Sequence, residues 1–373
     1  MKIGILTFWW SQDNYGQLLQ CYALQKYLWS LGHEAFLVRY RHSYERKATP
    51  LFIKVLKALN PIKLFKYLIY KIKQFKNLKE QKLYDRKFDD FREKYIICTD
   101  KVYNSYIELL NDLPQADAYI VGSDQIWNYN FLDIPRSISY HAYFLDFGNE
   151  TIKRISYAAS WGVNSLPQKV KNAITPLLAK FDYISVREEN GVELCKQCGI
   201  NNAEWVCDPT LLLSADDYRN LYKDNLSTIR KQMKKFLVLY MLGNECKFNI
   251  QTIFNWANEK QLDVIYITGN RIVNKRIKFF ATIPEWLYLL DNAEYVITNS
   301  YHCSVFCTIF NKRFGIIPLT GKDKEMNSRF DSLFELRGIG NHYITEYDFS
   351  VLQTNYIAKN VNVSEKFLNV LKE

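Results

Sequence analysis

Short runs of apolar residues alternate along the chain with longer stretches in which apolar residues return every three or four positions. The short runs are typical of strands buried in a parallel sheet, and the wider spacing is typical of helices that pack against one. We therefore predict an α/β fold with parallel sheets. The expected strands are residues 3–10, 35–40, 116–121, 155–158, 183–186, 236–241, 264–268, 295–297 and 314–317, and a further strand that ends near residue 205.

Two series of strands and helices are separated by a polar, lysine-rich stretch at residues 215–235. We place a domain boundary there, because polar stretches with few apolar residues connect domains rather than build their cores. The prediction is an N-terminal α/β domain at 1–215 and a C-terminal α/β domain at 235–373 that ends in a closing helix. Both are expected to be Rossmann-like, doubly wound domains that face each other across a cleft.

Most of the predicted strands end in small, polar or charged residues. The carboxyl ends of parallel strands share one rim, where ligands bind in open α/β sheets, so these residues are candidates for a site. An ordinary turn with an asparagine cap explains Asn14 and Gly16 equally well. Arg187 could pair with Glu188 or Glu189 instead of binding an anion. The candidates in the first domain are Asn14, Gly16, Ser123, Asp124 and Arg187.

His302 follows the predicted strand 295–297, and helical spacing begins at Ser304. It is therefore expected at a junction between a strand and a helix N-terminus, which is a favourable place for an anion. A helix cap or a packed side chain is the alternative interpretation. Arg329 comes early in a later predicted helix and is a second anion-binding candidate by position alone.

The composition, with 48% hydrophobic residues, indicates a folded protein. The net charge of +10 is concentrated in a helical insertion at about 51–96, where residues 51–79 hold eight lysines and no acidic residue. A basic amphipathic helix can lie on a membrane and attract anionic lipid, whereas the alternative is an insertion packed on the protein's own surface. No nucleic-acid partner is expected, because the basic face has no stacking platform or binding motif.

No apolar run is long enough to span a membrane, and the N-terminus has the pattern of a strand rather than of a signal peptide. A cytoplasmic location is therefore the default expectation, and the basic residues 51–79 could place the protein at the inner face of the membrane.

The eight cysteines are scattered, and Cys195 and Cys198 form a lone CxxC without histidine at metal spacing. We expect reduced thiols and no metal.

Six short motifs occur in the same order as in one known family, and the chain resembles the polysaccharide pyruvyl transferase family. The resemblance runs from the first strand to about residue 340 and omits the basic insertion. The motifs are Asn14-Tyr15-Gly16 with Leu19-Gln20, residues 121–128 (VGSDQIWN), residues 156–162 (SYAASWG), Ser185-Val186-Arg187-Glu188, Asp208-Pro209-Thr210 and residues 298–302 (TNSYH).

The resemblance implies two domains arranged as in the B-type glycosyltransferases. It implies transfer of a pyruvyl group from phosphoenolpyruvate to a sugar, as a ketal, in the biosynthesis of surface polysaccharide such as capsule or exopolysaccharide. No cofactor is required, phosphoenolpyruvate is the donor substrate, and the partner is a glycan acceptor carried on a lipid. By the same resemblance Arg187 holds the donor's carboxylate or phosphate, and His302 is the general acid/base.

One departure from the family concerns Ser300 and Tyr301, which are predicted to contact the donor. Many family members have Arg-Leu-His-Gly where this chain has Ser-Tyr-His-Cys at 300–303. Either Ser300, the helix N-terminus and Arg329 replace the missing arginine, or the donor is not phosphoenolpyruvate. The alternative functions are a glycosyltransferase that uses a nucleotide sugar and a non-catalytic glycan- or lipid-binding member of the family.

Overall fold

The structure is a computed structural model. It describes residues 1–41, 85–223, 235–243, 248–268 and 278–372, together with Ile69, Lys71 and Ile72. Apart from those three residues, the predicted basic segment 51–79 lies outside the described part of the chain.

The first half of the chain forms a six-stranded parallel sheet with the strand order β2-β1-β3-β4-β5-β6. All four residues of the central strands β3 and β5 are buried, as expected for a sheet that is covered on both faces. The strands are β1 (Lys2–Leu6), β2 (Glu34–Leu37), β3 (Ala118–Val121), β4 (Lys153–Ala159), β5 (Tyr183–Val186) and β6 (Glu204–Trp205).

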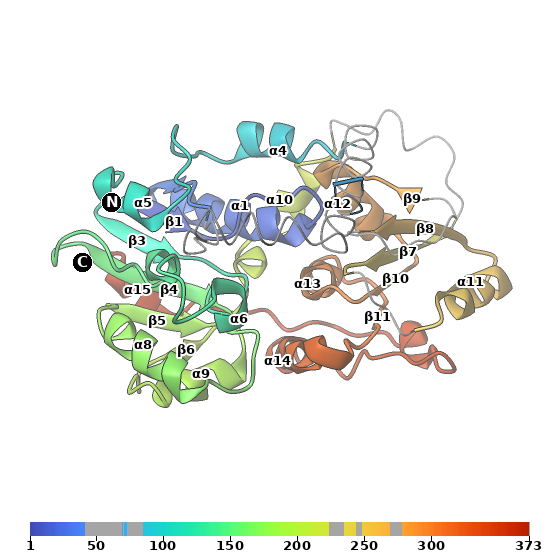
Figure 1. Cartoon of the computed structure of the whole chain (residues 1–373). Helices are drawn as coiled ribbons and strands as arrows, with labels where there is room; N and C mark the ends of the chain where they lie inside the picture. The colour runs from blue at the N-terminus through green and yellow to red at the C-terminus, as the bar shows by residue number, and fades with distance from the viewer. Residues whose placement is uncertain are drawn as a thin grey trace.

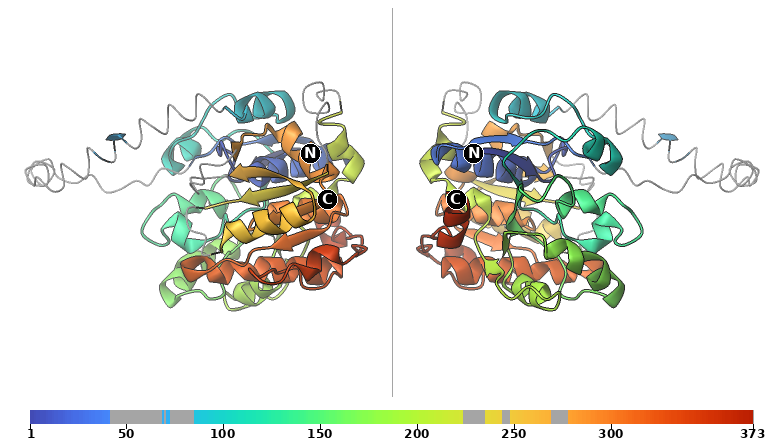
Figure 2. Two further views of the ribbon diagram at one scale, coloured as in Figure 1. Left: turned by 90° about the vertical axis from the view of Figure 1, so that its right-hand side faces the viewer. Right: turned by 90° about the vertical axis from the view of Figure 1, so that its left-hand side faces the viewer.

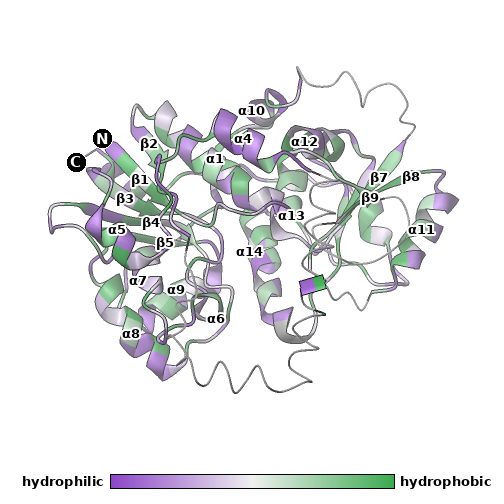
Figure 3. Ribbon diagram, turned by 45° about the horizontal axis from the view of Figure 1, so that its top comes forward, coloured by the Kyte–Doolittle hydropathy of each residue, from purple (hydrophilic) through white to green (hydrophobic). Residues whose placement is uncertain are grey.

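The second half forms a five-stranded parallel sheet with the strand order β11-β10-β7-β8-β9. In Figure 3 its strands β7 and β8 are coloured mainly as hydrophobic, whereas α11 on the outside carries both kinds of residue. The strands are β7 (Phe236–Met241), β8 (Asp263–Thr268), β9 (Lys278–Phe279), β10 (Tyr295–Thr298) and β11 (Phe314–Ile316).

Helices connect the strands and cover both sheets, with α13 lying between them in Figure 1. The α-helices are α1 (Tyr15–Ser30), α4 (Phe88–Tyr95), α5 (Tyr106–Asn111), α6 (Tyr129–Leu132), α7 (Tyr140–Tyr143), α8 (Gln168–Leu178), α9 (Glu189–Lys196), α10 (Ala215–Arg219), α11 (Ile250–Glu259), α12 (Ile283–Asn292), α13 (Tyr301–Ile309), α14 (Ser328–Arg337) and α15 (Glu365–Val370).

The N-terminal turn of α1 connects the two halves. The ring of Tyr15 stacks on Trp286 of α12, with ring centroids 4.9 Å apart, and its hydroxyl donates to the carbonyl of Ala281 at 2.6 Å. Both partners belong to the second half, so burial of one aromatic ring fixes the start of α1 against the other sheet.

The predicted α/β fold with parallel sheets is confirmed. Strand β9 was not predicted, because two residues are too short for a recognisable pattern. The closing helix α15, assigned above to the second domain, packs instead on the first sheet, where Phe367 contacts the rings of Tyr157 and Tyr183. Figures 1 and 2 show the two termini near each other beside that sheet. The domain bounds themselves remain a prediction.

The described helices include none that is long and apolar enough to cross a membrane. The described cysteines are free, and Cys195 and Cys198 are both buried. Burial raises the pKa of the Cys195 thiol to about 12, so this CxxC does not present a thiolate.

Candidate functional site

Three buried side chains meet at the carboxyl ends of strands in the first sheet. Arg187 follows β5, Asp208 follows β6, and Ser123 follows β3. Arg187 Nη1 donates to Asp208 Oδ2 at 3.0 Å and to Ser123 Oγ at 2.9 Å, and Ser123 Oγ donates to Asp208 Oδ2 at 2.7 Å. The side chains of Arg187 and Asp208 are both fully buried. Arg187 and Asp208 thus form a buried ion pair at the carboxyl ends of the strands, where ligands bind in open parallel sheets.

His302 comes to the same point from the second sheet. It follows β10 and lies in the first turn of α13, whose N-cap is Ser300. His302 Nε2 lies 3.5 Å from Asp208 Oδ2 and 3.5 Å from Arg187 Nη1, and the residue is only 5% exposed. The two halves of the chain therefore share one cluster of Arg187, Asp208 and His302, and a carboxylate orients the imidazole.

The N-terminal turn of α1 packs directly against the imidazole of His302. A Cβ atom added at Gly16 would lie 2.2 Å from His302 Cγ and 2.4 Å from His302 Nδ1. Only a glycine allows the helix to approach the imidazole so closely. The turn is held there by the Asn14 cap, which accepts from the amide of Gln17, and by the burial of Tyr15 described above.

Gly16→Ala is expected to displace the imidazole of His302. The helical backbone accepts alanine, but the methyl group would overlap the ring, and overpacking of this kind costs about 1–3 kcal/mol. With the acid/base role that the family resemblance implies for His302, we expect kcat to fall about 100-fold, because moving a catalytic group by an ångström costs about that factor. Steady-state kinetics and thermal unfolding test this result.

Gly340→Ala is the matched control, since a Cβ at Gly340 meets no atom within 4 Å. It should leave activity and thermal stability close to those of the unchanged protein. If Gly16→Ala behaves like this control, the contact with His302 is not a constraint on the site.

The charges within the cluster support one another. Burial alone would raise the pKa of Asp208, but His302, Arg187 and the hydroxyl of Thr210 outweigh it and hold that pKa well below its ordinary value. Burial lowers the pKa of Arg187, but the neighbouring Tyr301, Glu188, Asp208 and Asp124 raise it above the usual range. Asp208 and Arg187 are therefore ionised throughout the neutral range.

Tyr301 and Arg329 extend the cluster towards the second half. The Cζ atom of Arg187 lies 4.4 Å from the centroid of the Tyr301 ring, and that of Arg329 lies 5.8 Å from it. Both distances suit cation–π contact. Glu188 lies behind Arg187, with its Oε1 3.6 Å from Arg187 Nε, and also accepts a hydrogen bond from Ser160. The expected pairing of Arg187 with Glu188 is thus present beside the pair with Asp208.

Three other predicted residues hold backbone in place. Asn14 caps α1, and the Ser300 hydroxyl accepts from the amide of Cys303 at 3.4 Å, capping α13. Asp124 has a positive φ of 81° and accepts hydrogen bonds from the amide of Gln125 and from the side chain of Gln17. Ser300 is therefore occupied by capping, a role that is physically distinct from contact with a donor.

Asp208 was quoted in a motif above but received no role, and it has the largest number of polar contacts in the cluster. Besides Arg187, Ser123 and His302, it accepts from the amide and the hydroxyl of Thr210 at 3.0 and 2.6 Å. Its position at the carboxyl end of a strand, before a proline, is the signal that could have identified it.

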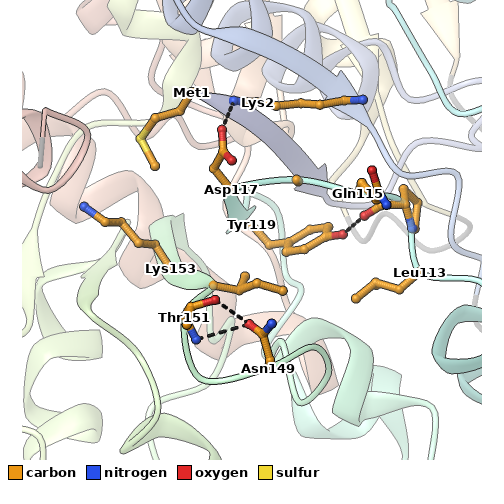
Figure 4. Close-up of a pocket in the computed structure, with 12 residues that line it drawn as sticks. Met1, Lys2, Leu113, Gln115, Asp117, Tyr119, Asn149, Thr151 and Lys153 are labelled. Atoms are coloured by element: carbon orange, nitrogen blue, oxygen red, sulfur yellow. Dashed lines mark hydrogen bonds between the residues drawn. The ribbon is translucent and has the colours of Figure 1, made fainter.

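A separate pocket of about 610 Å³ lies at the opposite end of the strands of the first sheet. It is lined by residues at the amino ends of β1, β3 and β4, and Figure 4 shows polar groups that bond to one another there. The Lys2 amide donates to Asp117, and the Thr151 hydroxyl donates to Asn149. This pocket is therefore distinct from the cluster around His302.

Among the residues that the structure describes, no three His, Cys, Asp or Glu side chains are grouped to hold a metal ion. Independence from metals remains a prediction.

Two solved structures with a similar fold cover nearly the whole chain. UDP-GlcNAc 2-epimerase of Methanocaldococcus jannaschii, solved with UDP-GlcNAc and UDP, matches at a TM-score of 0.53 and 13% identity, covering 100% of this chain and 99% of that chain. S. aureus MnaA, solved with UDP, matches at 0.54 and 10% identity, covering 99% and 95%. These likenesses show the fold, which is that of the B-type glycosyltransferases.

A search of the curated proteins gives no significant match. The family described as polysaccharide pyruvyl transferase, in contrast, matches residues 14–319. That span begins at the cap of α1 and includes Arg187, Asp208 and His302, the three residues that meet between the sheets. The chain therefore belongs to the polysaccharide pyruvyl transferase family.

Proposed function

We propose that this protein transfers a pyruvyl group from phosphoenolpyruvate to two hydroxyls of one sugar in a glycan, forming a ketal. The observation that carries the proposal is the contact of His302 with the buried Arg187–Asp208 pair, in a chain of this family. Histidine is the side chain most often used as a general acid or base, and the ionised Asp208 can stabilise its protonated form.

The reaction balances with proton transfers alone. The two hydroxyl oxygens form bonds to C2 of the donor, and the bond from C2 to the phosphate oxygen breaks. One hydroxyl proton goes to C3, which becomes the methyl group, and the other leaves on hydrogen phosphate. His302 would remove a proton from a hydroxyl, and the ionised Asp208 would stabilise the imidazolium.

Convergent helix N-termini support binding of the anionic donor. Gly16 lies in the first turn of α1, His302 in that of α13, and Arg329 in that of α14. The first turns of α1 and α13 carry backbone amides that favour a negative charge, whereas α14 continues directly from the 3-10 helix Gly321–Asn327 and contributes the guanidinium of Arg329. Ser300 would contribute to donor binding indirectly, because its hydroxyl caps α13 and so holds the N-terminal turn of that helix in place.

Release of phosphate from phosphoenolpyruvate in the presence of candidate sugar acceptors tests the function. The purified protein should release phosphate only when an acceptor with two suitably placed hydroxyls is present. The product should contain a ketal carbon detectable by NMR. Absence of release with every acceptor of a capsule or exopolysaccharide repeat would overturn the proposal.

Transfer of a sugar from a nucleotide is the second candidate, favoured by the likeness to two structures solved with UDP. Incubation with nucleotide sugars and the same acceptors separates the two. Release of UDP without consumption of phosphoenolpyruvate would support the second candidate.

The glycan acceptor is proposed to be linked to a lipid, which would place the protein at the inner face of the membrane. The basis is the sequence of residues 51–79 alone. Replacing Lys54, Lys57, Lys63 and Lys66 with glutamate should abolish sedimentation with anionic vesicles, since each lysine near such a surface contributes about 1 kcal/mol. Arginine at the same four positions is the control and should keep the binding. Equal binding by both variants would contradict the membrane contact.

A further inference from the structure

Arg187 is not open to a ligand in this structure. Its Nη1 is bound by Ser123 and Asp208, and its side chain is fully buried. Its Nε and Nη2 form no hydrogen bond with the described residues, and the ring of Tyr301 lies 4.4 Å from its Cζ. An anion could reach these groups only if the residues that bury them moved, among which are Tyr301 and Glu188.

Arg329 differs from Arg187 in which of its nitrogens are bonded and in being slightly exposed. Its Nε donates to the carbonyl of Met326 at 3.1 Å, whereas Nη1 and Nη2 form no hydrogen bond within the described part of the chain. The residue is 92% buried, being 8% exposed. Burial and the nearby charge of Arg187 lower the pKa of Arg329 to about 10, so its charge is poorly compensated. A buried guanidinium fork with two unfilled nitrogens suits an oxyanion.

Glu188 and Asp124, the two carboxylates whose charges raise the pKa of Arg329, form no hydrogen bond with it in the described part of the chain. Asp208 is bound by Arg187, Ser123 and Thr210, and Asp124 by Gln125 and Gln17. Glu188 faces Arg187 Nε and accepts from Ser160 through Oε1, whereas its Oε2 has no hydrogen-bond partner among the described residues. The hydroxyl of Tyr301, the residue next to His302, forms no hydrogen bond with a described residue. This hydroxyl is a further hydrogen-bond donor, and the ring that carries it is the one against which Arg187 and Arg329 both lie.

We infer that Arg329 and the Tyr301 hydroxyl, at the N-termini of α14 and α13, form the subsite for the donor's phosphate. Arg187 is then a positioning residue, which acts on His302 through Asp208 instead of holding the anion. The inference rests on the proposed function for the identity of the donor. A tetrahedral phosphate can accept at once from the guanidinium fork, the phenol and a helix N-terminus.

Calorimetric titration with inorganic phosphate, phosphoenolpyruvate and UDP tests the subsite without requiring turnover. The unchanged protein should bind phosphate and phosphoenolpyruvate. Arg329→Gln should weaken both by roughly 30-fold or more, the loss typical of removing one partner of a buried charge pair. Tyr301→Phe should weaken both by about tenfold, because a hydrogen bond to a charged group is lost. Arg329→Lys should bind with intermediate affinity, since charge remains but the fork does not.

Arg337→Gln is the matched control on the same helix, because the hydrogen bonds of Arg337 within the described residues go to the carbonyls of Lys359 and Thr308. It should lower thermal stability and leave the affinity for phosphate unchanged. Unchanged affinity in Arg329→Gln overturns the subsite, as does failure of the unchanged protein to bind either phosphate or phosphoenolpyruvate. So does binding of UDP alone.

The subsite and the proposed reaction can fail separately. Phosphate binding that depends on Arg329, without phosphate release from phosphoenolpyruvate and acceptor, supports the subsite and contradicts the reaction. Turnover of phosphoenolpyruvate that is undisturbed in Arg329→Gln supports the reaction and overturns the subsite.

Discussion

Replacing His302 with glutamine is expected to lower kcat for ketal formation by roughly 10²–10⁴-fold, the usual contribution of a general acid/base. The glutamine amide can still donate towards Asp208, but it cannot carry a proton between substrate atoms. Binding of phosphoenolpyruvate, measured by calorimetry, should remain, because the subsite at Arg329 is unchanged. Phosphate release under saturating donor measures the loss of kcat.

His141→Gln is the control for this substitution. His141 Nδ1 pairs with Asp146 at 2.7 Å, and its ring packs on Tyr106 and Tyr140, all of them in the first half of the chain. It should keep its activity. If His302→Gln also keeps its activity, His302 is a packed residue, which is the alternative that its sequence position left open. If turnover is lost while the donor still binds, a non-catalytic binding protein is excluded.

Asp208→Asn is expected to be the most destabilising of the conservative substitutions at the site. It leaves the fully buried Arg187 without its bonded carboxylate, and removal of one partner from a buried ion pair costs about 3–5 kcal/mol. The new amide would also point a donor at Arg187 or Ser123. Thermal and urea unfolding should both show the loss, and the orientation of His302 should be lost with it.

The destabilisation caused by Asp208→Asn should depend on pH in a direction that is set by the lowered pKa of Asp208. The pKa of Asp208 is lowered in the folded protein, so its contribution is present above the unfolded value of about 3.9 and is lost as the pH falls below it. The stability difference between the unchanged protein and Asp208→Asn should therefore shrink as the pH falls below about 4.

Asp112→Asn removes the partner of Lys101 in an exposed ion pair and is the control. It should leave the unfolding midpoint unchanged. A loss in Asp208→Asn no larger than in this control would contradict a structural role for the buried pair.

Much of the fold was predictable because burial on both faces leaves a clear local pattern. Strands β5 and β7 begin and end at the predicted residues, 183–186 and 236–241. Helix α1 begins three residues before the first apolar residue of its predicted repeat, since its start is set by the Asn14 cap. Strand β9 and the packing of α15 on the first sheet were missed. A two-residue strand has no period, and a short helix does not specify which sheet will cover its apolar face.

The sequence by itself determined that this is an α/β protein of two parallel sheets, and that Arg187 and His302 come at the carboxyl ends of strands. That information is local, because the pattern of apolar residues along each strand defines where it ends. Only the tertiary structure decided that Asp208 joins Arg187 to His302, that Gly16 closes on the imidazole, and that Tyr301 covers Arg187 while Arg329 keeps unfilled donors. Each of these contacts joins residues that are more than 20 positions apart in the chain. The contacts of His302 with Gly16 and Asp208, and of Tyr301 with Arg187, also depend on how the two sheets pack together. The packing of the two sheets leaves no local pattern in the sequence. The sequence could therefore indicate candidate site residues, but not which contacts each of them makes.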